Sequence, residues 1–214
     1  MDSSTHRCPL CGDTTEPCHE DQRRKYRQCP TCALISVPTP YQLDATAEKR
    51  YYELHENDPG DAGYRRFLSR AAEAVRTRVT PPAHGLDFGS GPGPTLSLML
   101  EEAGYTMSIY DKYFAARPLA LQETYDFVTA TEVFEHLARP ATIIRRLLSC
   151  LRPGGWLIVM TKRARDRAAF AQWHYTHDPT HIAFYGDATF HWIAERFGLE
   201  LDIVGADVVA LRQP

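Results

Sequence analysis

An acidic residue that closes an apolar run and leads into closely spaced glycines constrains the fold of this chain more than any other feature. The segment reads Leu86-Asp87-Phe88-Gly89-Ser90-Gly91-Pro92-Gly93. It predicts a strand followed by a turn in which glycines take positive φ and let backbone N–H groups approach a small polar or anionic ligand. A dinucleotide fingerprint would read G-x-G-x-x-G, but Pro94 stands where the third glycine belongs. This difference disfavours a nicotinamide cofactor.

A second strand with a carboxylate at its end follows. Residues 107–111 read Met-Ser-Ile-Tyr-Asp, and they come after a segment in which Leu96, Met99, Leu100 and Ala103 repeat with helical spacing. The two strands and this helix predict a βαβ unit. Asp111 would then end the second strand, where such folds bind a ribose.

Two further motifs complete an ordered set. Residues 125–137 read YDFVTATEVFEHL, and residues 151–160 read LRPGGWLIVM. With the glycine loop and Asp111, over roughly residues 64–211, they resemble the class I S-adenosylmethionine-dependent methyltransferases, specifically the small-molecule branch. The resemblance implies an α/β fold with a Rossmann-like doubly wound sheet, mostly parallel, that ends in an antiparallel hairpin at residues 199–204 and 207–211. Only 13 residues separate Asp111 from Tyr125, so the family's third strand and next helix must be short or partly missing.

The resemblance also implies a cofactor site at the ends of the first, second and fourth strands. S-adenosylmethionine would be held there by Asp87, Gly89, Ser90, Gly91, Gly93, Asp111, Lys112 and Glu132. His136 is the first candidate for a general base, because it follows the fourth strand where ligands gather and matches a Glu-His pair of the resembled enzymes. Alternatively, His136 caps the following helix.

A loop dense in aromatic and titratable side chains follows the fifth strand. In the resembled enzymes this segment closes over the acceptor, and their recurring histidine before the last helix aligns with His181. We therefore expect His174, Asp178 and His181 around the acceptor, unless they only hydrogen-bond the loop into place. A metal site formed by these three residues is disfavoured, because Pro179 prevents one continuous helix from aligning them.

Paired cysteines near the amino terminus predict a metal site. Cys8 and Cys11 form one C-x-x-C motif, Cys29 and Cys32 form another, and 17 residues separate the two. Four thiolates in this spacing supply the tetrahedral sulfur cage of a structural zinc ribbon. Disulfides are the disfavoured alternative, because the chain is expected to be cytoplasmic.

These motifs divide the chain into three parts. We predict a zinc ribbon at residues 1–38, a linker and helical lid at residues 39–63, and the S-adenosylmethionine-binding methyltransferase domain at residues 64–214. The ribbon and the methyltransferase domain are expected to have separate cores, so that loss of zinc would unfold the ribbon more than the rest.

Composition narrows the function. The 214 residues, 43% hydrophobic, can bury one sizeable core with a small appendage, and a net charge of −3 gives no overall attraction to nucleic acid. No apolar run is long enough to span a bilayer. We predict an S-adenosylmethionine-dependent methyltransferase with a small-molecule acceptor. The alternatives are a zinc-ribbon rRNA or tRNA base methyltransferase and a non-catalytic, cofactor-binding interaction protein.

Overall fold

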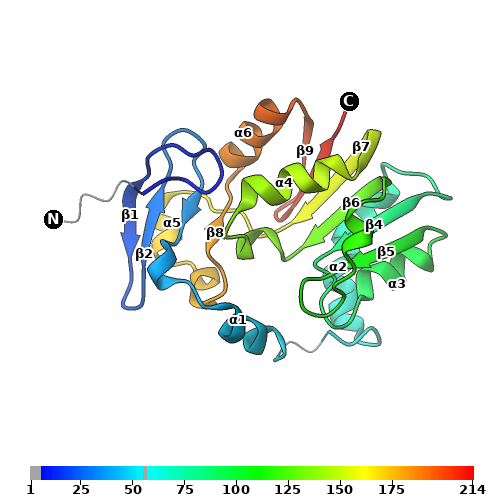
Figure 1. Ribbon diagram of the computed structural model, residues 1–214, viewed down its shortest axis with the longest axis horizontal. Coiled ribbons are helices and arrows are strands. Elements are labelled where there is room, and N and C mark those ends of the chain that lie inside the picture. Colours follow the sequence, from blue (N-terminus) through cyan, green and yellow to red (C-terminus); the bar gives the residue numbers. More distant parts are fainter. Residues whose placement is uncertain (1–5, 55–56) are drawn as a thin grey trace.

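The computed structural model describes residues 6–54 and 57–214, and its strands form two sheets (Figure 1). The larger sheet has the order β5-β4-β6-β7-β10-β9. Its strands are β4 (His84–Phe88), β5 (Thr106–Tyr110), β6 (Tyr125–Thr131), β7 (Leu151–Met160), β9 (Glu200–Val204) and β10 (Val208–Arg212). The first four pair in parallel, whereas β10 is antiparallel to both β7 and β9. The predicted mostly parallel sheet with a carboxyl-terminal hairpin is confirmed.

Apolar residues of β7 alternate between the two faces of this sheet. Leu157 and Val159 join one buried cluster, and Ile158 and Met160 join the other. Because side chains of a strand point to opposite faces in turn, a uniformly apolar strand needs a cover on both sides. The covers are α4 (Pro140–Ser149) and α6 (Asp187–Phe197) on the first face, and α2 (Ala62–Arg76) and α3 (Thr95–Glu101) on the second.

The connection from β5 to β6 holds no further strand. A 3₁₀ helix, η2 (Pro118–Leu121), spans part of it and contacts β5. This confirms that the family's third strand and its helix are absent or shortened. Strand β5 therefore forms one edge of the larger sheet.

The second sheet joins the amino-terminal segment to the carboxyl-terminal half. It has the order β1-β2-β3-β8, with β1 (Glu16–Glu20), β2 (Lys25–Gln28) and β3 (Ile35–Ser36) from the cysteine-rich segment. Strand β8 (Ala183–Phe184) comes from the loop before α6 and pairs antiparallel with β3. Helix α5 (Arg167–Ala171) contacts β1. The sheet is therefore built from two parts of the chain that lie far apart in the sequence.

The cysteine-rich segment also shares its core with the larger sheet. Cys8, Leu10 and Leu34 belong to the same buried cluster as Phe134 and Tyr185. The prediction of separate cores is therefore wrong, because apolar side chains of the segment belong to one buried cluster with residues of the larger sheet and α6.

Helix α1 (Ala45–Tyr52) connects the two parts of the fold. It follows a 3₁₀ helix, η1 (Thr39–Tyr41), and starts at Asp44, whose Oδ1 accepts hydrogen bonds from the N–H groups of Thr46 and Ala47. This cap satisfies two backbone donors that have no partner within the helix. None of its residues is buried. The predicted ranges 1–38 and 39–63 include residues 1–5 and 55–56, which lie outside the described residues.

Candidate functional site

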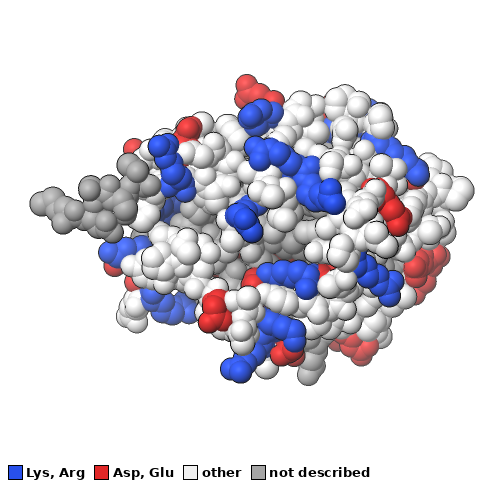
Figure 2. All heavy atoms as spheres, viewed as in Figure 1, with Lys and Arg blue, Asp and Glu red and all other residues white. Residues whose placement is uncertain are grey.

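A cavity of about 730 Å³ lies where β4, β5 and β6 end. It is lined by every residue that the sequence assigns to the cofactor, namely Asp87, Gly89, Ser90, Gly91, Gly93, Asp111, Lys112 and Glu132. Three of the four predicted acceptor-side residues, His136, Asp178 and His181, line the same cavity. The face of the molecule shown in Figure 2 is hollowed near its centre. Crevices at the carboxyl ends of parallel strands are the usual ligand sites of open α/β sheets.

The glycine loop folds back against the end of β5. Gly89 and Gly91 have φ of 79° and 65°, a region that favours glycine. The N–H of Gly89 donates to the carbonyl of Tyr110 at 2.7 Å, and the N–H of Gly91 donates to Oδ2 of Asp111 at 3.1 Å. A side chain at Gly93 would clash with the carbonyl oxygen of Asn57. The loop is therefore enclosed between β5 and the segment that leads from α1 to α2.

Asp111 is held in one orientation by backbone donors. Its Oδ1 accepts from the N–H groups of Tyr113 at 2.7 Å and Phe114 at 3.0 Å, and its Oδ2 accepts from Gly91. Next to it, Lys112 Nζ donates to Oε2 of Glu48 in α1 at 2.7 Å. These contacts place α1 across the ends of the strands.

Asp87 lies at the floor of the cavity and is only 2% exposed. Its carboxylate accepts hydrogen bonds from Oγ1 of Thr129 at 2.9 Å and from Oγ of Ser97 at 3.2 Å. Burial raises the pKa of Asp87 to about 6.

Glu132, at the end of β6, has the unusual φ of 52° for a residue with a side chain. Its N–H donates to the carbonyl of Met160 at 2.8 Å, which ties this turn to β7. Burial raises the pKa of Glu132 to about 7. Residues held in sparsely populated backbone regions cluster at functional sites, and this one lines the cavity.

Two histidines line the same cavity as the glycine loop. The rings of His136 and His181 lie 4.8 Å apart between centroids. Nδ1 of His136 donates to the carbonyl of Thr180 at 3.1 Å, and Nδ1 of His181 donates to the carbonyl of Tyr175 at 2.8 Å. Since a carbonyl only accepts, each Nε2 keeps its lone pair. Burial lowers the pKa of both rings, that of His136 to about 3, and Asp178 Oδ2 lies 3.7 Å from Nε2 of His181.

The structure does not bring His174 to the cavity. It lies on η4 (His174–His177), is exposed, and accepts a hydrogen bond at Nε2 from Nζ of Lys162 at 3.1 Å. The next residue, Tyr175, is buried instead, and its hydroxyl donates to Glu135 and to Glu132.

Three residues that the sequence analysis did not select surround the histidines. Glu135, on η3 (Phe134–His136), is completely buried, and burial raises its pKa well above the usual value for Glu. Tyr175 contacts the ring of His181, and Tyr52 of α1 lies edge-on to His136 with 5.2 Å between ring centroids. The density of aromatic residues around 173–185 and the tyrosine pair at 51–52 are the sequence signals that point to two of them.

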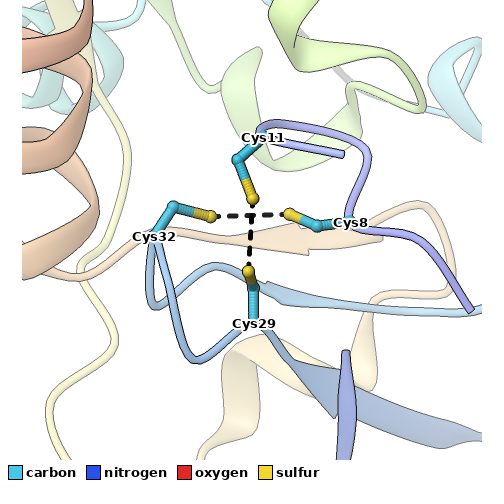
Figure 3. A group of neighbouring side chains, drawn as sticks. All are labelled: Cys8, Cys11, Cys29 and Cys32. Atoms are coloured by element: carbon cyan, nitrogen blue, oxygen red, sulfur yellow. Dashed lines mark hydrogen bonds between the residues drawn. The ribbon is translucent and has the colours of Figure 1, made fainter. Parts of the chain in front are cut away.

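The four predicted cysteines meet at one point (Figure 3). Their sulfurs lie within 4.8 Å of one another, with 3.4 Å between Cys8 and Cys32 and 3.3 Å between Cys11 and Cys29. None forms a disulfide. A tetrahedral zinc site with Zn–S bonds of about 2.3 Å places its sulfurs about 3.8 Å apart. The cluster therefore fits a zinc ion after small shifts of its side chains.

Within the described part of the chain, no helix is both long enough and apolar enough to cross a membrane.

A family model described as a methyltransferase domain matches residues 61–203. The chain belongs to this family. The ubiquinone biosynthesis O-methyltransferase of Stutzerimonas stutzeri (strain A1501) is 32% identical over 106 residues, which are 49% of this chain and 44% of that protein. Its counterpart in Colwellia psychrerythraea (strain 34H / ATCC BAA-681) is 30% identical over 131 residues, 60% of this chain and 50% of that protein. The matches therefore span half or less of these relatives.

Solved structures support the same fold. The 1,6-didemethyltoxoflavin-N1-methyltransferase of Burkholderia thailandensis, solved with 1,6-didemethyltoxoflavin and S-adenosylhomocysteine, superimposes with a TM-score of 0.59 at 14% identity. The superposition covers 92% of this chain and 99% of that one. At this identity the likeness shows the fold alone.

Proposed function

We propose that this chain is a methyltransferase that uses S-adenosylmethionine to methylate an oxygen atom of a small acceptor. The observation that carries the proposal is a cavity that the glycine loop and Asp111 line together with His136 and His181. Family membership and the name of the O-methyltransferase relatives support it.

The cofactor side of the cavity is formed by the glycine loop and the strand ends. In our proposal, Asp111 accepts hydrogen bonds from the ribose hydroxyls, because its carboxylate is already fixed by three backbone donors. Asp87 and Glu132 provide negative charge near the cationic part of the cofactor. When bound, S-adenosylmethionine supplies an electrophilic methyl group, so the protein has mainly to align the acceptor with it.

The acceptor side is formed by His136, Asp178 and His181. The free Nε2 atoms of the two histidines accept hydrogen bonds from an acceptor hydroxyl and orient its oxygen. A histidine with a pKa of about 3 is a weak base at neutral pH, so we assign His136 to orientation rather than to proton abstraction. His174 is omitted from this assignment because it lies outside the cavity wall.

Basic side chains indicate the charge of the acceptor. Arg139 and Arg146 line the cavity, and neither forms an ion pair among the described residues. Lys and Arg side chains also lie on several sides of the central hollow (Figure 2). We propose that the acceptor carries a negative group. The same feature favours a second candidate, a structured RNA, whose phosphates would bind this rim.

The zinc ribbon has a structural role in this proposal, since four cysteine ligands leave no open position on zinc for substrate. None of the six cysteines forms a disulfide. Free thiols fit a reducing compartment, and we place the protein in the cytoplasm on that basis.

Calorimetry with S-adenosylmethionine tests the cofactor site. The Asp111→Asn protein should bind about 10- to 100-fold more weakly than the wild type, because a charged hydrogen-bond acceptor is lost. Glu195→Gln is the matched control. It removes the charge of an exposed residue on α6 and should bind S-adenosylmethionine normally. Equal affinities for all three proteins would contradict the assignment of Asp111.

A screen with radiolabelled S-adenosylmethionine tests the reaction. Label should pass to anionic, hydroxylated metabolites. Transfer to RNA alone would favour the second candidate. Tight cofactor binding without transfer to either pool would leave a non-catalytic binding protein.

A further inference from the structure

Glu135, His136 and His181 bring three metal-binding groups together beside the cavity. One carboxylate oxygen of Glu135 and one ring nitrogen of each histidine lie within 4.8 Å of one another. Two of the residues are consecutive in the turn after β6, and the third comes from the loop before β8. The N–H of Ile182 donates to the carbonyl of Glu135 at 2.7 Å, which holds the two segments side by side.

The histidines are oriented as metal ligands usually are. Each Nδ1–H donates to a backbone carbonyl, that of Thr180 for His136 and that of Tyr175 for His181. The hydrogen bond from Nδ1–H fixes the tautomer. It leaves the lone pair of Nε2 available to bind a metal ion, as is typical of metal-bound imidazole. The fixation comes from the backbone, so it does not depend on a bound ligand.

Glu135 offers a buried carboxylate oxygen beside the two histidines. Its Oε1 accepts from the hydroxyl of Tyr175, whereas Oε2 is buried and has no hydrogen-bond partner among the described residues. A buried carboxylate oxygen without a partner is costly and calls for an explanation. A metal ion would provide the missing partner.

We propose that Glu135, His136 and His181 bind a divalent transition-metal ion, separate from the zinc of the four-cysteine cluster. Two imidazoles and one carboxylate form a donor set used for catalytic zinc and for non-heme iron. Metal bonds of about 2.0–2.2 Å require the donor atoms to approach by about 1 Å, which small rotations of the side chains supply. His136 and His181 line the cavity, so the remaining positions on the ion open toward it.

The site has a consequence that rests on the proposed function: with the ion bound, the Nε2 atoms of His136 and His181 would orient the acceptor through the ion and not by accepting its hydroxyl hydrogen bond. An ion at this position would coordinate an oxygen of the acceptor, and coordination lowers the pKa of a hydroxyl group. The proton would then leave to solvent, and no strong protein base would be needed. The class of acceptor that fits is one with a hydroxyl oxygen, preferably beside a second oxygen that also binds the ion.

Cobalt binding to the 214-residue chain tests the site without any need for turnover. Equilibrium dialysis against Co²⁺, followed by elemental analysis, should give two ions per wild-type chain. His181→Gln and Glu135→Gln should each hold one ion, with the intense sulfur-to-cobalt absorption of the cysteine cluster unchanged. His191→Gln, which removes an exposed histidine of α6, should hold two.

The complementary variant separates the two sites. Cys29→Ser should lose the sulfur-to-cobalt absorption and retain one ion with the weaker spectrum of nitrogen and oxygen ligands. Circular dichroism identifies any variant that does not fold. His181→Gln and Glu135→Gln, the two substitutions in the triad of Glu135, His136 and His181, serve as independent checks on each other. One ion per chain in wild type, or two in both folded triad variants, would overturn the proposal. Neither result would change the calorimetric test of the cofactor site.

Discussion

Arg24 connects the zinc ribbon to the loop that carries Asp178 and His181. It is only 5% exposed. Its guanidinium donates to three carbonyls of that loop, those of Thr176 at 2.5 Å, Asp178 at 2.8 Å and Pro179 at 3.2 Å. These carbonyls would lose the Arg24 donor in an Arg24→Met protein, which keeps most of the apolar stem of the side chain.

The expected loss follows from these three contacts. A hydrogen bond to a charged group contributes about 1.5–3 kcal/mol, but three bonds from one guanidinium to one loop are not additive. We expect Arg24→Met to lower the free energy of unfolding by about 2–4 kcal/mol. Arg23→Met is the matched control, because Arg23 is exposed and donates once to the same loop, to the carbonyl of His177 at 3.0 Å. It should cost about 0.5 kcal/mol or less.

Urea unfolding and hydrogen exchange measure the two effects. In the Arg24 variant, the amides of His181 and Ile182, which donate to backbone carbonyls in this region, should exchange faster than in wild type. Amides in the centre of β7 should keep their relative protection. If Arg23→Met and Arg24→Met lower stability equally, or if the loop amides are unaffected, the ribbon does not hold this loop.

Two further predictions concern the cofactor side of the cavity. Because burial raises the pKa of Asp87 to about 6, against about 3.9 in an unfolded chain, its contribution to stability should grow as pH falls from about 7 toward 4. The difference in unfolding free energy between wild type and Asp87→Asn should therefore rise over that range, and a flat difference would contradict the burial argument. Gly93→Ala should displace Asn57 and weaken S-adenosylmethionine binding by calorimetry, whereas Gly12→Ala, which is strained by a φ of 87° but lies outside the cavity lining, should bind normally.

The larger sheet and the glycine loop could be predicted because their signals are local. The uniformly apolar run in β7 indicates a strand covered on both faces, and the spacing of apolar residues in α3 follows from helix periodicity. The metal site of the four cysteines could also be predicted, because each C-x-x-C motif is a short local pattern. The shortened connection before Tyr125 could be seen from its length alone.

The contacts between the two sheets could not be predicted. Strands β3 and β8 have two residues each and are separated by more than half the chain. Such short strands have no periodicity of their own, and their pairing is decided by tertiary packing. The same limit explains why His174 lies outside the cavity lining, because only packing determines that the neighbouring Tyr175 turns inward from a short 3₁₀ helix.

Glu135 could not be singled out from the sequence for a related reason. A carboxylate beside His136 in the sequence reads as a surface charge at a strand end, and complete burial of Glu is rare unless it has a partner. Its burial depends on Tyr175, 40 residues later in the chain. Sequence spacing cannot show this contact.

The shared core changes what loss of zinc should do. Cys8, Cys29 and Cys32 are buried in the cluster that also contains Phe134 and Tyr185. A structural zinc ion contributes about 10–16 kcal/mol of apparent binding free energy in isolated zinc fingers, which exceeds or equals the typical net stability of a domain, about 5–15 kcal/mol. Release of the ion should therefore loosen the face of the larger sheet beneath α6 together with the ribbon.

The Cys29→Ser variant tests this prediction without a chelator. A chelator would also remove an ion bound by Glu135, His136 and His181. In the variant, amides in β6 and α6 should lose protection along with those of β2, and thermal unfolding should move to lower temperature as a whole. Cys18→Ser makes the same substitution at a cysteine outside the cluster and should retain one equivalent of zinc with near-normal protection. If β6 and α6 keep wild-type protection while the ribbon exchanges freely, the two parts are energetically independent despite their common core. The β3–β8 pairing and the packing of Leu34 would then contribute little to the stability of the larger sheet, because contacts that stabilise both partners must couple their unfolding.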